Sequence, residues 1–85
     1  MKVTFKRKNL EVSCECLLVS QIENKTITSI TFKSEEMGII DMWGDVIEES
    51  NAVLIYDEDD GVEFKIITSR IEKYENYAFI RINCN

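Results

Sequence analysis

Apolar and polar side chains alternate along residues 10–18 of this chain. The apolar positions are Leu10, Val12, Cys14, Cys16 and Leu18, and Glu11, Ser13 and Glu15 lie between them. A period of two is typical of a β-strand with one buried face. We therefore expect a strand over residues 10–21, with Cys14 and Cys16 as small buried side chains on the same face.

Two further strands are predicted on either side of this one. Val3 and Phe5 alternate in the same way before it, and Lys8-Asn9 offers a tight turn. Residues 26–33 are rich in β-branched side chains, which favour strands. Strands at 2–7, 10–21 and 26–33 would form an antiparallel meander.

Residues 35–49 have the pattern of an amphipathic helix. Their apolar side chains fall within one arc of about 120° on a helical wheel: Ile39, Ile40, Trp43, Val46 and Ile47. Four carboxylates fall on the opposite side: Asp41, Asp45, Glu48 and Glu49. We expect Trp43 to lie in the core, although Trp is also the residue most enriched at binding hot spots.

The last third of the chain returns to strands. Residues 52–57 and 62–67 flank a four-residue turn that ends in Asp-Gly, which indicates a hairpin. Residues 77–84 alternate again. The predicted fold class is α+β: a mostly antiparallel sheet of about six strands, in the order β-β-β-α-β-β-β, with one helix near 35–49. The alternative is a small curled β-barrel with the helix as a plug.

Length and composition favour a single folded domain over residues 1–85. The chain has 85 residues, 45% of them hydrophobic and 31% charged, which suits one small core. No apolar run approaches the roughly 20 residues that span a bilayer, and the basic N-terminal residues lack the apolar run of a secretory signal. Three cysteines do not complete a disulfide framework. We therefore expect a cytoplasmic protein without membrane contact.

The residues that most enzymes need are missing from the sequence. The chain contains no histidine, so it has neither the commonest general base nor a Ser-His or Cys-His nucleophile pair. No glycine-rich phosphate loop occurs. We expect a protein without catalytic activity.

Two groups of residues contain side chains that could bind a metal ion. Cys14, Cys16 and Cys84 could supply three thiolates, but a structural zinc site needs a fourth ligand, and the Cys-x-x-Cys spacing is absent. Residues 57–63 fit a calcium loop only if Tyr56 and Ile67 served as its first and last ligands, and neither can. We expect no metal and no cofactor.

Negative charge is concentrated in the middle of the chain. Residues 35–63 hold eleven acids and no Lys or Arg, within a net charge of −6. One interpretation is a solvated surface that keeps a small domain soluble. The other is a carboxylate surface that binds a basic partner. Its predicted residues lie on the helix and the hairpin: Asp41, Asp45, Glu48, Glu49, Asp57, Glu58, Asp59, Asp60 and Glu63.

Two functional hypotheses follow from this distribution. The first is a non-enzymatic inhibitor or adaptor whose carboxylates occupy a basic surface of a larger protein. A nucleic-acid-processing enzyme blocked by phosphate mimicry, in the manner of phage-type inhibitors, is the concrete version. The second is a structural subunit that self-associates through exposed strand edges, for example as a homodimer. Direct nucleic-acid binding is not expected, because the basic cluster at residues 2–8 belongs to a chain of net charge −6.

Overall fold

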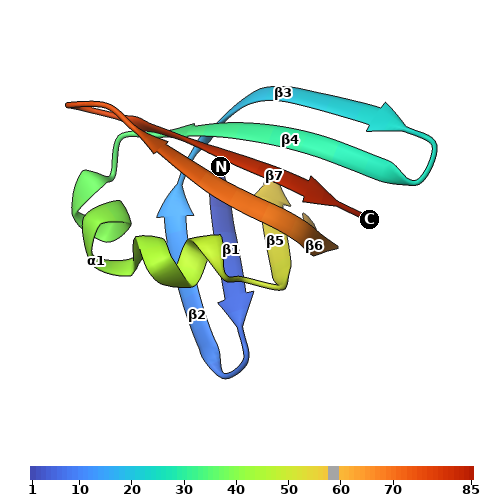
Figure 1. Cartoon of the computed structure of the whole chain (residues 1–85), viewed down its shortest axis with the longest axis horizontal. Helices are drawn as coiled ribbons and strands as arrows, with labels where there is room; N and C mark the ends of the chain where they lie inside the picture. Colours follow the sequence, from blue (N-terminus) through green and yellow to red (C-terminus); the bar gives the residue numbers. More distant parts are fainter. Residues whose placement is uncertain (58–59) are drawn as a thin grey trace.

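The computed structural model describes residues 1–57 and 60–85, which form one antiparallel sheet and one helix (Figure 1). The elements in chain order are β1 (Lys2–Arg7), β2 (Leu10–Glu15), β3 (Leu17–Asn24), β4 (Ile27–Ser34), α1 (Met37–Glu48), β5 (Ala52–Asp57), β6 (Asp60–Lys73) and β7 (Ala78–Cys84). Within these residues the sheet has seven strands, in the order β2-β1-β5-β6-β7-β4-β3. The predicted α+β class is confirmed. The barrel alternative is wrong, because the sheet ends at β2 and β3 and these strands do not pair with each other.

The long strand β6 belongs to both halves of the sheet. Residues up to Lys65 pair with β5, and residues from Ile66 onward pair with β7. The register shifts between Ile66 and Thr68, and an irregularity of this kind lets a strand bend from one sheet into another. We call β2, β1, β5 and the start of β6 the first half-sheet. The rest of β6, with β7, β4 and β3, is the second half-sheet, and its strands cross over the first in Figure 1.

The hydrophobic core lies between the two half-sheets. The first half-sheet contributes Val3, Phe5, Val12, Cys14 and Val53 to one buried cluster. The second contributes Ile30, Phe32, Ile80, Ile82 and Cys84. Each of these side chains is at most 7% exposed, and they alternate along their strands with outward-facing residues. Each half-sheet therefore has a core face and an outer face.

Helix α1 covers the core face of the first half-sheet at one end. Ile40, Val46 and Ile47 are its buried residues, and the helix contacts β1, β2 and the end of β6. Its amphipathic stripe was therefore predicted in the right place. The observed helix begins two residues later than the predicted 35–49 and ends one residue earlier.

The predicted single strand over residues 10–21 is wrong in one respect. The chain forms two strands here, which are separated at Cys16, and β3 pairs with β4 instead of continuing beside β1. The N–H of Cys16 donates to the carbonyl of Met1, and the chain then crosses to the other half-sheet. Alternation runs through both strands, so it could not reveal where the chain changes sheets. The three N-terminal strands are therefore not a meander.

Two other sequence predictions need correction. Strand β6 extends to Lys73, well beyond the predicted 62–67. Trp43 is 41% exposed, although the helical wheel places it in the apolar stripe. A wheel gives the direction of a side chain but not how much of the sheet lies beneath it.

Two glycines should respond in opposite ways to substitution by alanine. A Cβ at Gly44 would lie 3.4 Å from the terminal carbon of Ile71, an ordinary contact, while a glycine inside a helix costs about 1 kcal/mol relative to alanine. Gly44→Ala should therefore raise the free energy of unfolding by about 0.5–1 kcal/mol. A Cβ at Gly61 would lie 2.8 Å from the Tyr56 ring, so Gly61→Ala should lower that free energy by about 1 kcal/mol.

Urea denaturation of the two variants beside the parent chain measures both effects. Destabilisation by Gly44→Ala would mean that α1 packs more tightly on β6 than the structure indicates.

Candidate binding surfaces

The carboxylates of α1 are largely engaged with the sheet. Asp41 lies 3.0 Å from the Lys73 ammonium at the end of β6. Glu49, directly after the helix, lies 2.9 Å from the Arg7 guanidinium of β1. Asp45, by contrast, makes no ion pair or side-chain hydrogen bond within residues 1–57 and 60–85. Two of the four predicted helix carboxylates are therefore partly neutralised by cations of the same molecule.

Glu48 protects an exposed backbone group. From Ile66 onward β6 has β7 on one side, while its pairing with β5 has ended on the other. Glu48 Oε2 accepts a hydrogen bond of 2.9 Å from the Ile71 N–H on this side. A carboxylate at the C-terminal end of a helix opposes the helix dipole. Here the contact with β6 offsets that cost and explains an acid in this position.

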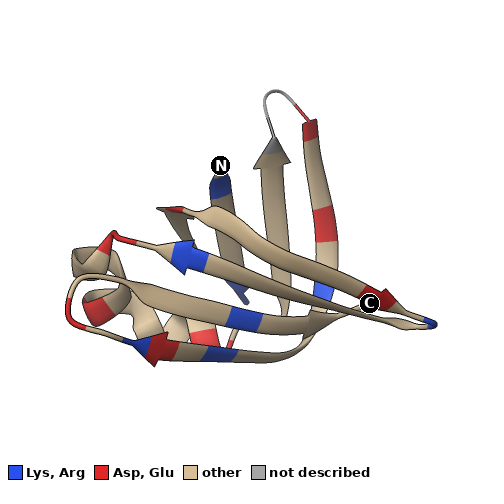
Figure 2. Cartoon of the chain, turned by 90° about the horizontal axis from the view of Figure 1, so that it is seen from above, with Lys and Arg blue, Asp and Glu red and all other residues tan. Residues whose placement is uncertain are grey.

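Glu63 on β6 does not join Glu49 of the helix end on one surface. Glu63 lies 3.4 Å from the Lys6 ammonium, whereas Glu49 pairs with Arg7. Successive residues of a strand point to opposite faces, so these two carboxylates lie on opposite sides of β1. Figure 2 shows the helix at one end of the molecule and strand β5 with the start of β6 extending away from it.

Three of the predicted residues cannot be placed in full. Asp60 is exposed at the start of β6. Glu58, Asp59 and the side chain of Asp57 lie outside the described part of the structure. The six predicted residues whose side chains are described are thus distributed over the helix and its end, the outer face of the first half-sheet and the start of β6.

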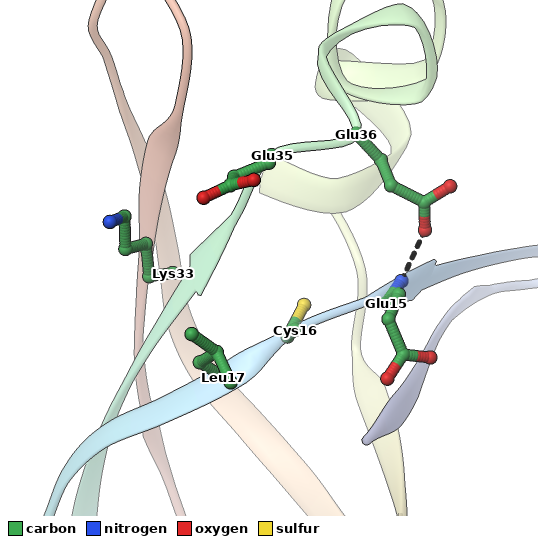
Figure 3. Close-up of a pocket in the computed structure, with 6 residues that line it drawn as sticks. All are labelled: Glu15, Cys16, Leu17, Lys33, Glu35 and Glu36. Carbon is green, nitrogen blue, oxygen red and sulfur yellow. Dashed lines mark hydrogen bonds between the residues drawn. The ribbon is translucent and has the colours of Figure 1, made fainter.

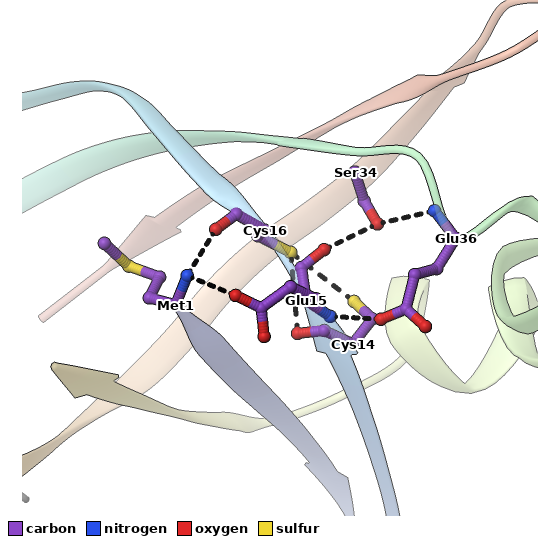
Figure 4. A network of polar contacts seen from close by, with 6 residues as sticks. All are labelled: Met1, Cys14, Glu15, Cys16, Ser34 and Glu36. Atoms are coloured by element: carbon purple, nitrogen blue, oxygen red, sulfur yellow. Dashed lines mark hydrogen bonds and ion pairs between the residues drawn. The ribbon is translucent and has the colours of Figure 1, made fainter. Parts of the chain in front are cut away.

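The segment before α1 covers the edge strand β2 (Figure 4). Glu36 accepts a hydrogen bond from the Glu15 N–H, and the Ser34 hydroxyl donates to the Glu15 carbonyl over 2.9 Å. On the other side of Glu15, the N-terminal ammonium lies 2.7 Å from its carboxylate. The contacts of Glu36 and Ser34 occupy the outward-pointing N–H and carbonyl of Glu15, where another strand could otherwise pair.

The cysteines are core residues, as predicted. Cys14 and Cys16 are each 2% exposed, and their sulfurs lie 3.5 Å apart. The hydrogen bond between them lowers the pKa of Cys14 and raises the pKa of Cys16. Cys84 is also buried, which raises the pKa of its thiol, and it contacts the Thr28 carbonyl. Within the described residues, no three Cys, Asp or Glu side chains are grouped closely enough to hold a metal ion.

A small pocket of about 200 Å³ lies where the chain crosses from β2 to β3 (Figure 3). Its lining residues are Glu15, Cys16, Leu17, Lys33, Glu35 and Glu36. Glu15 and Glu36 already serve the contacts around β2, and Cys16 is buried. Lys33 lies over the Tyr77 ring. Glu35 is therefore the one charged lining residue without a side-chain partner among the described residues, and a single free carboxylate does not make a site.

Strand β3 is the other end of the sheet, and it is unprotected. Seven of its eight residues are exposed. They include large apolar side chains: Leu17 is 64% exposed, Leu18 43%, Val19 53% and Ile22 64%. Among the described elements, only β4 forms backbone hydrogen bonds with β3. In Figure 1 the β3–β4 hairpin reaches beyond the rest of the molecule.

The outer face of the second half-sheet carries polar and basic side chains in rows across the strands. The register aligns one row as Arg70, Arg81, Thr31 and Ser20, on β6, β7, β4 and β3. The next row is Thr68, Asn83, Ser29 and Ile22. Together these rows line most of a shallow groove of about 400 Å³, which we call the outer groove.

An aromatic cluster borders the outer groove. Tyr74 and Tyr77 stack with their ring centres 5.0 Å apart, and both meet Phe79 edge-on. The Tyr74 hydroxyl donates to Glu72, which also accepts from Arg81. The hydrogen bond from Tyr74 is the main reason that the pKa of Glu72 lies below its usual range, and Arg81 contributes less. The same hydrogen bond raises the pKa of Tyr74.

Comparison with known proteins gives no family for this chain. No protein-family model, curated protein or solved structure matches it. Within the described residues, no helix has the length and apolar character required to cross a membrane. Among the surfaces of the described residues, β3 and the arginine row of the outer groove are the least engaged in internal contacts.

Loss of the Glu48 carboxylate should destabilise the fold, whereas loss of Asp45 should not. Glu48→Ala leaves the Ile71 N–H without its acceptor, and a charge-assisted hydrogen bond at an exposed site is worth about 1 kcal/mol. Urea denaturation should therefore show a free energy of unfolding about 1 kcal/mol lower for Glu48→Ala than for the parent chain. Asp45→Ala removes an equal charge without a contact and should stay within about 0.5 kcal/mol of the parent chain. Equal effects of the two changes would contradict the role given to Glu48.

The pKa of Glu72 should rise towards its ordinary value in a Tyr74→Phe variant. The hydroxyl that stabilises its carboxylate form is then absent, although Arg81 remains. Because the pKa of Glu72 is lowered in the folded state, the ionised carboxylate stabilises the fold at pH values above the ordinary pKa of a carboxyl. This stabilisation is lost as the pH falls through the lowered pKa. Titration of the Glu72 side chain by NMR measures the shift. Tyr77→Phe is the control, since Tyr77 stacks on Tyr74 without a bond to Glu72.

Proposed function

We propose that this chain is a non-catalytic subunit that associates with a second copy of itself through strand β3. The observation that carries the proposal is the long, exposed and largely apolar edge of β3, which lacks the cover seen at the end of β2 and along β6. Glu36 and Ser34 cover the end of β2, and Glu48 covers β6 where β5 has ended. Edge β3 has no such cover among the described residues.

The sequence of β3 lacks the usual defences of an edge strand. Natural edges are protected by Lys, by Pro, by short length or by an inward-pointing charge. Residues 17–24 contain no Lys, Arg or Pro, and Glu23 is their one charged residue. An eight-residue edge with apolar side chains on both faces favours strand addition, in which backbone hydrogen bonds supply affinity and side chains supply specificity.

The apolar surface on β3 supports a macromolecular partner over a small ligand. Leu17 and Ile22 pair with Lys33 and Ser29, so they lie on the outer face, while Leu18 pairs with the buried Phe32 on the core face. Full burial of each such side chain contributes about 1.5–3 kcal/mol. An added strand would cover apolar groups on both faces at once.

A second copy suits this edge because β3 is self-complementary. The two-residue turn after Asn24 sets the alternation of hydrogen bonds, so the backbone groups of Gln21 and Glu23 point away from β4. An antiparallel β3–β3 pair centred on Ile22 therefore joins Gln21 to Glu23 of the other copy. It places Ile22 against its symmetry mate at the closest approach of the strands. No like charges oppose each other in this register, and two-fold dimers are the commonest oligomers.

Charge on β3 should prevent association. Ile22→Lys replaces a central apolar contact by two opposed ammonium groups, because each substitution occurs twice in a two-fold dimer. Loss of about 1.5 kcal/mol per side chain corresponds to at least a 100-fold weaker dimer. Sedimentation equilibrium over a range of protein concentrations measures the dissociation constant.

Met42→Lys is the matched control, since it places the same charge at an apolar side chain of α1 that is 71% exposed. The parent chain and Met42→Lys should dimerise, and association should persist at high salt because apolar burial and backbone bonds drive it. A parent chain that is monomeric at high micromolar concentration would refute self-association. If a strand of a different protein binds the parent chain but not Ile22→Lys, that protein and not a second copy is the partner of β3.

A further inference from the structure

We propose that Arg70, Arg81 and Thr31 form a site in the outer groove for the phosphate group of a small ligand. The proposal does not depend on strand addition at β3. It starts from an arrangement that costs stability in the free protein, because two arginines occupy directly opposed positions of neighbouring strands. Arg70 pairs with Arg81 in the β6–β7 register, so both guanidinium groups are on the same face.

Like charges directly opposite each other across a strand pair are destabilising. Arg81 is partly compensated, since its side chain lies 3.3 Å from Glu72 and over the Phe79 ring. Arg70 has no ion pair with any residue of the described structure. An anion between the two guanidinium groups would turn the repulsion into a pair of charge-assisted hydrogen bonds.

The neighbouring positions of the same row supply more donors. Thr31 pairs with Arg81, and Ser20 pairs with Thr31, so two hydroxyls follow the two guanidinium groups across the sheet. Neither hydroxyl takes part in a side-chain hydrogen bond with the described residues. In the next row Ser29, Asn83 and Thr68 bond to one another over 2.6 and 2.8 Å. One row is thus satisfied internally, and the other offers free donors to the groove.

The chemistry of the row favours phosphate over carboxylate. A carboxylate presents two coplanar oxygens and matches one guanidinium in a bidentate pair. A phosphate group presents three acceptor oxygens in a tetrahedral arrangement, so it can be approached by two guanidinium groups and a hydroxyl together. The outer groove, at about 400 Å³, has the size of a small-ligand site.

The net charge of the chain favours a small ligand over a nucleic acid. Each additional phosphate of a polymer would approach a molecule of net charge −6, and polyanion affinity depends on the neutralisation of many phosphates at once. Arg70 and Arg81 can neutralise one group. The aromatic cluster beside them is already stacked on itself, with Tyr74 against Tyr77.

Inorganic phosphate is the probe for the test. Its dissociation constant is measured by NMR titration of the full chain at constant ionic strength, with chloride as the replaced anion. We expect saturable shifts at Arg70, Arg81 and Thr31. Arg70→Gln should weaken phosphate binding by about tenfold or more, since it removes a charge-assisted contact. Thr31→Val, which changes no charge, should weaken it severalfold.

Lys65→Gln is the matched control, because it removes one exposed positive charge from the first half-sheet and leaves the row intact. It should bind phosphate as the parent chain does. A second measurement follows from the like-charge pair: in chloride alone, Arg70→Gln should melt at a higher temperature than Lys65→Gln. Sedimentation equilibrium of Arg70→Gln should match the parent chain, which separates this proposal from the one for β3.

Three results would overturn the proposal. One is the absence of saturable phosphate binding to the parent chain, and another is equal phosphate binding by the parent chain and Arg70→Gln. The third concerns the ligand: if oligothymidylate binds more tightly than inorganic phosphate and Arg70→Gln abolishes that binding, the row recognises a nucleic-acid backbone and the small ligand is wrong.

Discussion

The bend in β6 is the constraint on which the rest of the structure depends. One strand pairs with β5 along its first part and with β7 along its second, so a single sheet supplies both layers of the core. A chain of 85 residues has little apolar surface with which to build two separate sheets. Sharing a strand joins the layers covalently and by hydrogen bonds. The consequence is that strand edges appear wherever β6 leaves one partner for the next.

Several side-chain positions in this protein can be understood as cover for strand edges, on β6 and at the end of the sheet. The chain uses a carboxylate at the wrong end of a helix, Glu48, to bind the Ile71 N–H beyond the end of β5. It uses Ser34, the last residue of β4, and Glu36, in the link before α1, to occupy the backbone groups at the end of β2. Both contacts join segments far apart in the sequence, and both consume groups that would otherwise seem available to a partner.

The sequence predicted the elements better than their arrangement, because period and propensity are local. Val3, Phe5, Val12 and Cys14 were recognisable as core residues from alternation alone, and the apolar stripe of α1 from its helical period. The division of residues 10–21 at Cys16 was not recognisable, since the alternation continues through the crossover. The full length of β6 was not predicted because its second part lacks a clear alternation of apolar and polar residues. Thr68, Arg70 and Glu72 form its outer face, but its core face includes the polar Ser69.

The functional surfaces were harder to predict for a physical reason. Clustering of acids along the chain does not determine their clustering in space, and the structure separates Glu49 from Glu63 by a strand and pairs each with a cation. Among the described residues, the hypothesis that the acidic segment binds a basic protein therefore depends chiefly on Asp45 and Asp60. The row of Arg70, Arg81 and Thr31 leaves no trace in the sequence, because it arises only from the register of β6, β7 and β4. Exposure of β3 was equally hidden, since its apolar residues resemble those of a core strand.

The two proposed surfaces share the second half-sheet, and this division of the molecule has a physical basis. Helix α1 stabilises the first half-sheet and the end of β6, and the charges of Asp41, Glu48 and Glu49 are engaged internally. Among residues 1–57 and 60–85, no helix lies on the outer face of the second half-sheet, and nothing covers its last strand. A protein of this size has few residues that the fold does not need. Those on β3 and in the arginine row carry costs, in exposed apolar area and in like-charge repulsion, that the fold alone does not require.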